Sequence, residues 1–275
     1  MSLTPSPKKP PSSGPPTVLV PGSRVVFCAP QPPQEFWRLL CDSGLDEGVG
    51  FTNAADRLFE IARDLRPRVI AFVGEEAYHQ AFGQRPDFGV QPRILADTAL
   101  FVLPDAAVPY AERLRWFHAL REWLDEPVQE RRAVRALILD SRGRTLLLRW
   151  PRPGGPPWWI APGGGVEPGE SDEAALRREL AEELGLALDD PGPCIWTREF
   201  TFPWRSGWWH QRERYYLVRA DASALTGGED SANAKWWSVQ EIASSDELFA
   251  PARLAELLNE LAANGPPSAP VDVGI

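Results

Sequence analysis

The stretch Gly164–Leu186, GGVEPGESDEAALRRELAEELGL, decides the fold of the C-terminal half of the chain. It predicts a glycine-containing loop followed by a helix over Ser171–Leu184, with Ser171 or Asp172 available as the N-terminal cap. An apolar stripe along one face can dock this helix onto a sheet, and it consists of Leu176, Leu180 and Leu184.

Three glutamates share the neighbouring face of the same predicted helix. Glu179, Glu182 and Glu183 stand at positions i, i+3 and i+4, where like charges destabilise an isolated helix. Such a group needs a counter-charge, and Mg²⁺ or Mn²⁺, which prefer oxygen ligands, would supply it. The glycines Gly163, Gly164 and Gly165 allow the preceding backbone to turn tightly and approach a ligand. The arrangement fits delivery of metal-activated water to a phosphate.

The segment resembles the signature of the Nudix hydrolase family, G-x5-E-x7-R-E-U-x-E-E-x-G-U, in which U is a bulky aliphatic residue. Nine fixed positions are filled within twenty-three residues, and the resemblance extends over roughly residues 131–261. The matching positions are Gly164, Glu170, Arg178, Glu179, Leu180, Glu182, Glu183, Gly185 and Leu186.

This resemblance implies roles for individual residues. The glutamates of the helix, Glu179, Glu182 and Glu183, would bind divalent metal. Glu170 would support the metal site, and Arg178 would hold the glutamates through salt bridges. Water would attack a phosphorus of a diphosphate in a nucleoside di- or triphosphate derivative. The catalytic base would be a glutamate of the signature, with Glu213 as a candidate outside it.

Two other interpretations of the signature remain open. The helix could be a glutamate-rich helix with one face in solvent, or the domain could bind a nucleotide as a sensor without cleaving it. Tight binding without turnover would distinguish a sensor from an enzyme.

Aromatic and basic residues downstream supply candidates for substrate binding. Phe200–His210 is predicted to be a long hairpin loop over the site, and an exposed Trp208 could stack on a base. Arg205 and Arg212 could bind phosphate or ribose, together with the backbone of Gly163–Gly165. Alternatively, these tryptophans fill the core of a small domain.

Composition limits the remaining possibilities. The chain has 275 residues, a formal net charge of −9 and three cysteines, which suggest a reducing, cytoplasmic compartment. No apolar run is long enough for a transmembrane helix, so no membrane is expected as a partner. Nucleic-acid binding draws on basic residues, and an acidic chain is a poor partner for DNA.

The sequence predicts an α/β protein with two domains. We expect a disordered proline-rich tail at residues 1–16, an α/β domain at 17–126, a linker at 126–130, a second domain at 131–264 and a disordered tail at 265–275. In the first domain, strands at Arg24–Cys28, Val69–Gly74 and Leu100–Leu103 alternate with helices.

The first domain resembles mismatch-specific uracil-DNA glycosylases through RVVFC, FWRLLCDSGL, GVGFTNAADR, RPRVIAFVGEEAYHQAFG and LFVLPD, taken in order. That resemblance implies a three-layer α/β domain, followed by the α/β/α sandwich with a mixed sheet that the Nudix resemblance implies. Ala29–Pro33 and Pro104–Val108 replace the polar active loops of the glycosylases. We therefore expect a degenerate domain that does not catalyse base excision. Its role could be to form a homodimer, to dock a partner or to cover the site of the second domain. The alternative is a DNA-repair protein whose first domain binds uracil-containing or mismatched DNA.

Overall fold

The computed structural model describes residues 19, 22–29, 35–95, 98–151, 156–203 and 207–274. The chain divides into two compact units, residues 1–125 and 126–275. The boundary lies directly after a helix, and the next strand begins at Val128, so the predicted linker is shorter than expected. The predicted tail at residues 1–16 lies outside the described residues.

Unit 1 is built on a five-stranded sheet with the order β2-β1-β3-β5-β4. All neighbouring strands are parallel except β4, which runs antiparallel to β5. Both faces of β1 and β3 are buried, as the continuous apolar runs predict. The strands are β1 (Val25–Cys28), β2 (Val49–Thr52), β3 (Val69–Val73), β4 (Gly89–Leu95) and β5 (Thr98–Leu103).

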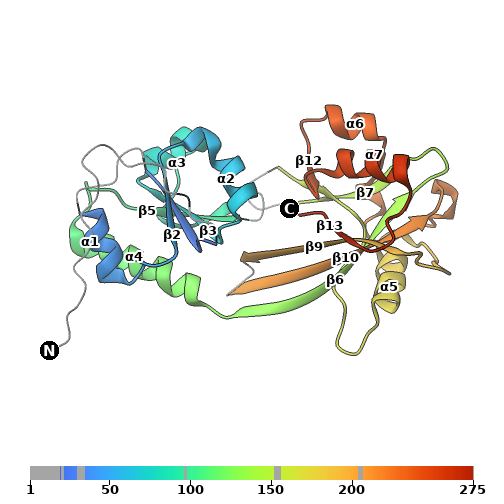
Figure 1. Cartoon of the computed structure of the whole chain (residues 1–275), viewed down its shortest axis with the longest axis horizontal. Helices are drawn as coiled ribbons and strands as arrows, with labels where there is room; N and C mark the ends of the chain where they lie inside the picture. The colour runs from blue at the N-terminus through green and yellow to red at the C-terminus, as the bar shows by residue number, and fades with distance from the viewer. Residues whose placement is uncertain are drawn as a thin grey trace. The chain divides into compact units, whose positions relative to one another are not determined.

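Helices cover both faces of this sheet (Figure 1). On one face, α1 (Phe36–Ser43) and α4 (Tyr110–Asp125) bring Phe36 and Phe117 against Phe27 of β1. On the other, α2 (Leu58–Leu65) and α3 (Glu75–Phe82) pack on residues of β1, β3 and β5. The predicted three-layer α/β architecture of this unit is confirmed.

Unit 2 contains an eight-stranded mixed sheet with the order β12-β8-β7-β6-β10-β9-β13, and β11 pairs with β7. β6 and β10 run parallel, whereas β9 and β10 form an antiparallel pair. The strands are β6 (Val128–Leu139), β7 (Thr145–Trp150), β8 (Trp158–Ile160), β9 (Cys194–Pro203), β10 (Trp208–Arg219), β11 (Ala234–Trp237), β12 (Leu248–Ala250) and β13 (Val271–Asp272).

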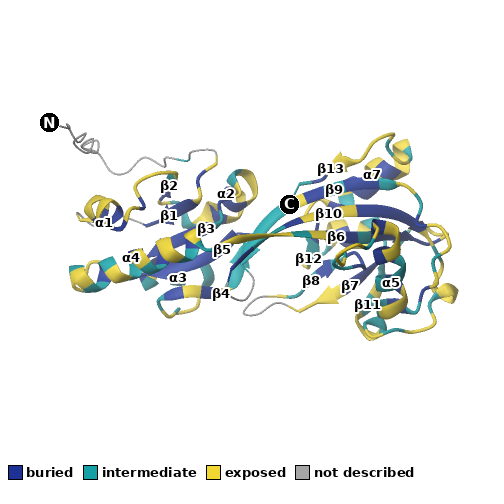
Figure 2. Ribbon diagram, turned by 90° about the horizontal axis from the view of Figure 1, so that it is seen from below, coloured by how far each residue is buried: buried dark blue, intermediate teal, exposed yellow. Residues whose placement is uncertain are grey.

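The sheet of unit 2 also lies between helices. On one face, α5 (Asp172–Leu184) packs against Val134, Ala136 and Ile138 of β6. On the other, α6 (Val239–Ser244) and α7 (Leu254–Asn264) cover a second apolar core. Figure 2 shows β6 changing from exposed to buried along its length. Within the described residues, no helix is long and apolar enough to cross a membrane.

Two sequence-based predictions are wrong in unit 2. The segment predicted as a long loop, 200–210, is largely strand, because β9 continues to Pro203 and β10 begins at Trp208. The segment 265–275, predicted to be disordered, contains β13, which pairs with β9. The amide of Val273 donates a hydrogen bond to the carbonyl of Thr197, and its side chain joins the core under α7. Burial of one apolar residue and this pairing order a segment that is rich in proline and glycine.

Replacing Val273 with Asp should therefore destabilise unit 2. Val273 is 3% exposed, and a carboxylate placed there loses its hydration. We expect the free energy of unfolding to fall by about 2 kcal/mol or more in urea titrations. Val271, on the same strand, is 48% exposed, so Val271→Asp is the matched control. Equal stability of the two variants would show that β13 contributes nothing to the core.

Candidate active site

Local sequence fixes the start, the end and the buried side of α5. Ser171 accepts a hydrogen bond from the amide of Ala174 at 3.2 Å, which makes it the N-cap. Gly185 ends the helix in the left-handed conformation, with φ at 63°. The predicted leucine stripe is fully buried against the sheet. The neighbouring face of α5 therefore carries the carboxylates of Glu179, Glu182 and Glu183.

Arg178 is the centre of the charged cluster on α5. Its guanidinium donates two hydrogen bonds to the carboxylate of Glu170, at 3.1 and 2.9 Å. It also donates to Glu179 at 2.9 Å and to Glu182 at 3.5 Å. A further hydrogen bond, 2.9 Å long, reaches the carbonyl of Gly165. One guanidinium thus ties the helix to the glycine loop.

The glycine loop runs along β6 and is held mainly through its backbone. The amide of Val134 donates to the carbonyl of Gly164 at 2.9 Å. Arg135 donates to the carbonyl of Gly163 at 2.5 Å, while the amide of Gly163 donates to Glu183 at 2.8 Å. The carbonyls of Gly163 and Gly164 therefore accept hydrogen bonds from β6.

Close approach explains two of the glycines. Gly163 has φ at 126°, and a Cβ there would collide with the carbonyl of Val134. A Cβ on Gly164 would collide with the carboxylate of Glu179. Glycine at position 163 therefore lets the loop approach β6, and glycine at position 164 lets the carboxylate of Glu179 approach the loop.

Glu183 is the most perturbed carboxyl group on α5. Burial raises its pKa to about 7, and the charges of Glu179 and Asp230 act in the same direction. The hydrogen bond from Gly163 and the charge of Arg135 oppose this rise but do not cancel it. A cation close to Glu183 would therefore stabilise the charged form of this buried carboxylate.

The donor set suits a hard divalent cation, although its oxygens do not yet converge. Glu179, Glu182 and Glu183 supply carboxylates on one helix face, and Glu182 has a 55% exposed side chain. Among the described residues, no group of three or more acidic, histidine or cysteine side chains is already arranged to hold a metal ion. Glu179 and Glu182 instead contact Arg178.

Glu213 lies in a different cluster from these glutamates. It is 2% exposed and accepts hydrogen bonds from Arg135 at 3.0 Å and Arg198 at 3.2 Å. Gln211 and Tyr215 donate to it as well. Although burial alone would raise its pKa, the two arginines hold the pKa of Glu213 at about 2. The structure places this carboxylate behind Arg135, where it anchors the arginine that holds Gly163.

Comparison with known proteins identifies the domain that carries α5 and the glycine loop. Residues 129–260 match the family model described as the NUDIX domain. Residues 129–260 are a NUDIX domain. The RNA pyrophosphohydrolase of Shigella boydii serotype 4 (strain Sb227) is 31% identical over 118 residues, which make up 43% of this chain and 59% of that protein. That of Tolumonas auensis is 34% identical over 100 residues, 33% of this chain and 56% of that protein.

The chain thus spans less than three fifths of the length of these curated relatives. Among solved structures, that of the Escherichia coli ORF135 protein is 27% identical, with a TM-score of 0.39. The match covers 52% of this chain and 96% of that one. A MutT NUDIX hydrolase from Burkholderia pseudomallei is 26% identical, with a TM-score of 0.39 and coverage of 48% and 98%.

The remaining predicted substrate-binding residues of the NUDIX domain are not gathered at α5. Trp208 is fully buried, so the prediction that it is exposed and stacks on a base is wrong. Arg212 lies on the face of β10 opposite Glu213 and pairs with Glu130 at 3.4 Å and Glu199 at 3.5 Å. Arg205 lies outside the described residues.

A second acidic loop lies against α5, and the sequence-based reasoning missed it. The amides of Glu229 and Asp230 donate to the carbonyls of Glu182 and Glu183, at 2.9 and 3.1 Å. Gly228 permits this contact, because a Cβ there would meet the backbone of α5. The sequence signal was Gly227-Gly228-Glu229-Asp230, a glycine pair beside two acidic residues.

Gly164→Ala should displace Glu179 while leaving the hydrophobic core of the domain intact. The added methyl group occupies the space of the Glu179 carboxylate. We expect Mn²⁺ binding, followed by electron paramagnetic resonance, to weaken about tenfold or more, since one carboxylate leaves its position. Gly207→Ala is the control for glycine replacement, because Gly207, like Gly164, has no positive φ and a Cβ there would meet only the carbonyl of Pro127, at 3.4 Å. Unchanged Mn²⁺ affinity in Gly164→Ala would contradict this assignment of Glu179.

Glu183 should make the stability of the metal-free domain depend on pH. Its folded-state pKa of about 7 exceeds the ordinary value of 4.5, so the folded state binds more protons between these values. Stability should fall as pH rises through this range, by about 2 kcal/mol between pH 5.5 and 8. Glu183→Gln should lack this part of the decline in urea titrations with chelator. Tryptophan fluorescence reports on this half, which holds nine of the twelve tryptophans.

Glu173→Gln is the control for that measurement, because its side chain is 63% exposed on the same helix. If the wild type and Glu183→Gln lost the same stability over this pH range, the raised pKa would be contradicted.

Proposed function

We propose that the NUDIX domain hydrolyses a phosphoric anhydride bond in a nucleoside di- or triphosphate derivative, with Mg²⁺ or Mn²⁺ as cofactor. The match over residues 129–260 supports the reaction class. The observation that carries the proposal is the convergence of Glu170, Glu179 and Glu182 on the single guanidinium of Arg178, beside the glycine loop.

Charge balance supports a cation at this place. Glu170, Glu179, Glu182 and Glu183 carry up to four negative charges, and Arg178 contributes one positive charge. Glu183 is held by a backbone amide rather than by a guanidinium, and its raised pKa reflects uncompensated burial. Glu179, Glu182 and Glu183 would hold the cation, which neutralises phosphate charge and acts as a Lewis acid when bound.

The side chains of the chain have separate tasks in the proposed reaction. Arg178 and Glu170 fix the direction of α5 and the position of the glycine loop. A water oxygen forms a bond to phosphorus while the bridging P–O bond of the anhydride breaks, giving two phosphate-bearing products. The proton of that water passes to a carboxylate of the signature. Glu213, already paired with two arginines, serves as a positioning residue for Arg135 rather than as the base.

Unit 1 is proposed to be a degenerate glycosylase-like domain with no base-excision activity. Its three-layer architecture is compatible with this idea, and its acidic balance disfavours DNA, since residues 17–126 carry 11 basic and 16 acidic residues. In the loop after β5, the carboxylate of Asp105 accepts a hydrogen bond from the amide of Ala107 and so serves the turn. Homodimerisation is one proposed role, and the three unpaired cysteines favour a cytoplasmic location.

A product assay on the full-length protein tests the proposed function. The panel contains canonical and oxidised nucleoside triphosphates, nucleoside diphosphate sugars, dinucleoside polyphosphates and NADH, with and without Mg²⁺. Since two curated relatives are named RNA pyrophosphohydrolases, an RNA oligonucleotide with a 5′-triphosphate is included. We expect metal-dependent cleavage of at least one compound, and chromatography of the products shows which phosphorus is attacked.

Glu182→Gln and Glu183→Gln should each lower turnover of that compound at least about a hundredfold, because each removes a metal-binding carboxylate. Glu173→Gln changes the same helix on its exposed side and should keep wild-type turnover. Wild-type rates in both signature variants would overturn the mechanism, and metal binding without any cleavage would favour the sensor alternative.

A further inference from the structure

Strands β6, β9 and β10 place a row of aromatic rings on the face of the sheet that also carries Glu213. Trp209 lies opposite Phe202 in the register of β9 and β10, and Gln211 lies opposite Phe200. Residues opposite one another share a face, so Phe200, Phe202 and Trp209 form one surface, termed here the aromatic platform. Each of these three residues is half-buried.

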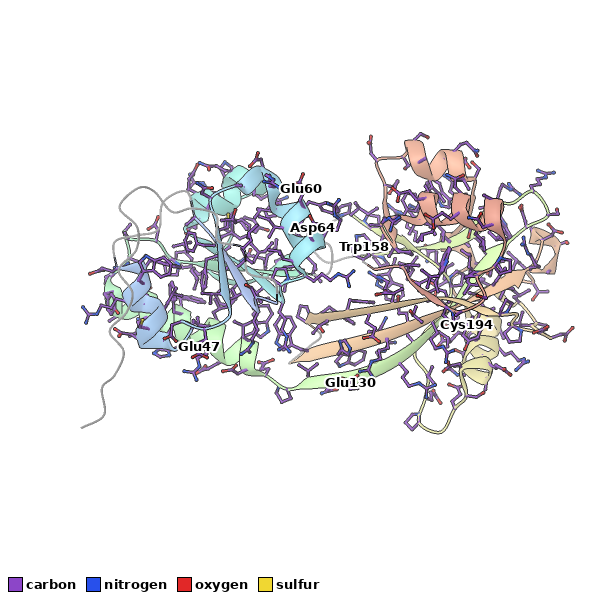
Figure 3. The ribbon with its side chains drawn as sticks, viewed as in Figure 1. Glu47, Glu60, Asp64, Glu130, Trp158 and Cys194 are labelled. Atoms are coloured by element: carbon purple, nitrogen blue, oxygen red, sulfur yellow. The ribbon has the colours of Figure 1, made fainter. Side chains whose placement is uncertain are left out.

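The rings of the aromatic platform contact each other in sequence. Phe200 and Phe202 are stacked, with centroids 5.3 Å apart and planes at 28°. Phe202 meets Trp209 edge to face at 6.2 Å. The core under α7 reaches Trp196 and Tyr215 on the same two strands. The platform continues from that core toward the outer ends of the strands, near Glu130 in Figure 3.

Arg131 connects the aromatic platform to the glycine loop. Its guanidinium lies 5.0 Å from the centroid of the Trp209 ring and donates a hydrogen bond to Gln211. Its Nη2 comes within 3.0 Å of the point where a Cβ on Gly165 would lie. Gly165 is the residue whose carbonyl Arg178 also holds. A continuous path therefore leads from the rings through Arg131 to the carboxylate cluster.

The strand face between the aromatic platform and the glycine loop has an excess of positive charge. Arg131, Arg135 and Arg198 share the strand face with one carboxylate, that of Glu213. Burial, followed by the repulsion of Arg135, lowers the pKa of Arg131. A phosphate placed beside Arg131 would relieve that repulsion, so the charge suits an anion that bridges the platform and α5.

We propose that the aromatic platform stacks the base of the nucleotide substrate and that Arg131 binds its phosphate chain. This inference rests on the proposed function and gives the base-stacking role predicted for Trp208 to its neighbour Trp209. Rings tolerate any base, because every base presents a π-face. The site thus distinguishes nucleotides from other diphosphates through Trp209, and it does so outside the signature helix.

Binding measured without turnover tests this proposal. Equilibrium dialysis with Ca²⁺ in place of Mg²⁺ compares ATP, GTP, CTP and UTP with inorganic tripolyphosphate, using full-length protein. Trp209→Ala should weaken nucleotide binding about tenfold and change tripolyphosphate binding less than twofold. Trp209→Phe should restore most of the nucleotide affinity. Arg131→Met should weaken binding of nucleotides and tripolyphosphate alike.

Trp150→Ala is the matched control, because Trp150 lies on β7 and is 46% exposed. The proposal is overturned if Trp209→Ala binds nucleotides as the wild type does, if it loses both ligand classes equally, or if the wild type binds no nucleotide. If the wild type and Trp209→Ala hydrolyse nucleotides equally well, the role of the aromatic platform is contradicted and the proposed reaction stands. If nucleotide binding depends on Trp209 but no compound is hydrolysed, the proposed reaction is contradicted and the role of the platform stands.

Discussion

The guanidinium of Arg178 is the contact on which the site depends. Glutamates at i, i+3 and i+4 repel one another on a helix, and Arg178 offsets this by contacting Glu170, Glu179 and Glu182. Its fourth partner, the carbonyl of Gly165, is part of a loop that pairs with β6. The contacts of Arg178 therefore fix the position of α5 relative to the loop and the sheet. A single ion pair on the helix would not connect all three.

A second layer of charge supports the loop from the other side. Arg135 holds Gly163 and is itself held by the buried Glu213, which Arg198 also contacts. Breaking such a buried pair leaves an uncompensated charge, so Glu213 is constrained by structure even though it stands outside the signature. Arg135 and Arg178 are the centres of these two layers. Glu183 accepts its hydrogen bond from the backbone amide of Gly163 instead.

Helical spacing and the capping residue were enough to predict α5, its cap and its buried leucines. The contacts of Arg178 with the glutamates were implied by the resemblance to the signature, and its hydrogen bond to the carbonyl of Gly165 was not predicted. It could not decide between Trp208 and Trp209, since adjacent strand residues face opposite sides and only register with β6 and β9 shows that Trp208 is inside. Glu213 was a candidate for the catalytic base because its partner Arg135 is 78 residues away in the sequence, and their ion pair is visible only in the fold. Val273 lay in a segment of loop-like composition, and its order comes from pairing with β9.

Direct titration with Mn²⁺, followed by electron paramagnetic resonance, tests the central claim that the carboxylates held around Arg178 form a divalent-cation site. The full-length wild type should bind Mn²⁺, and Glu179→Gln should bind it at least about tenfold more weakly, because it removes a ligand next to the glycine loop. Glu173→Gln, on the exposed side of α5, should bind Mn²⁺ as the wild type does. Failure of the folded wild type to bind Mn²⁺, or equal affinity in all three proteins, would contradict the account.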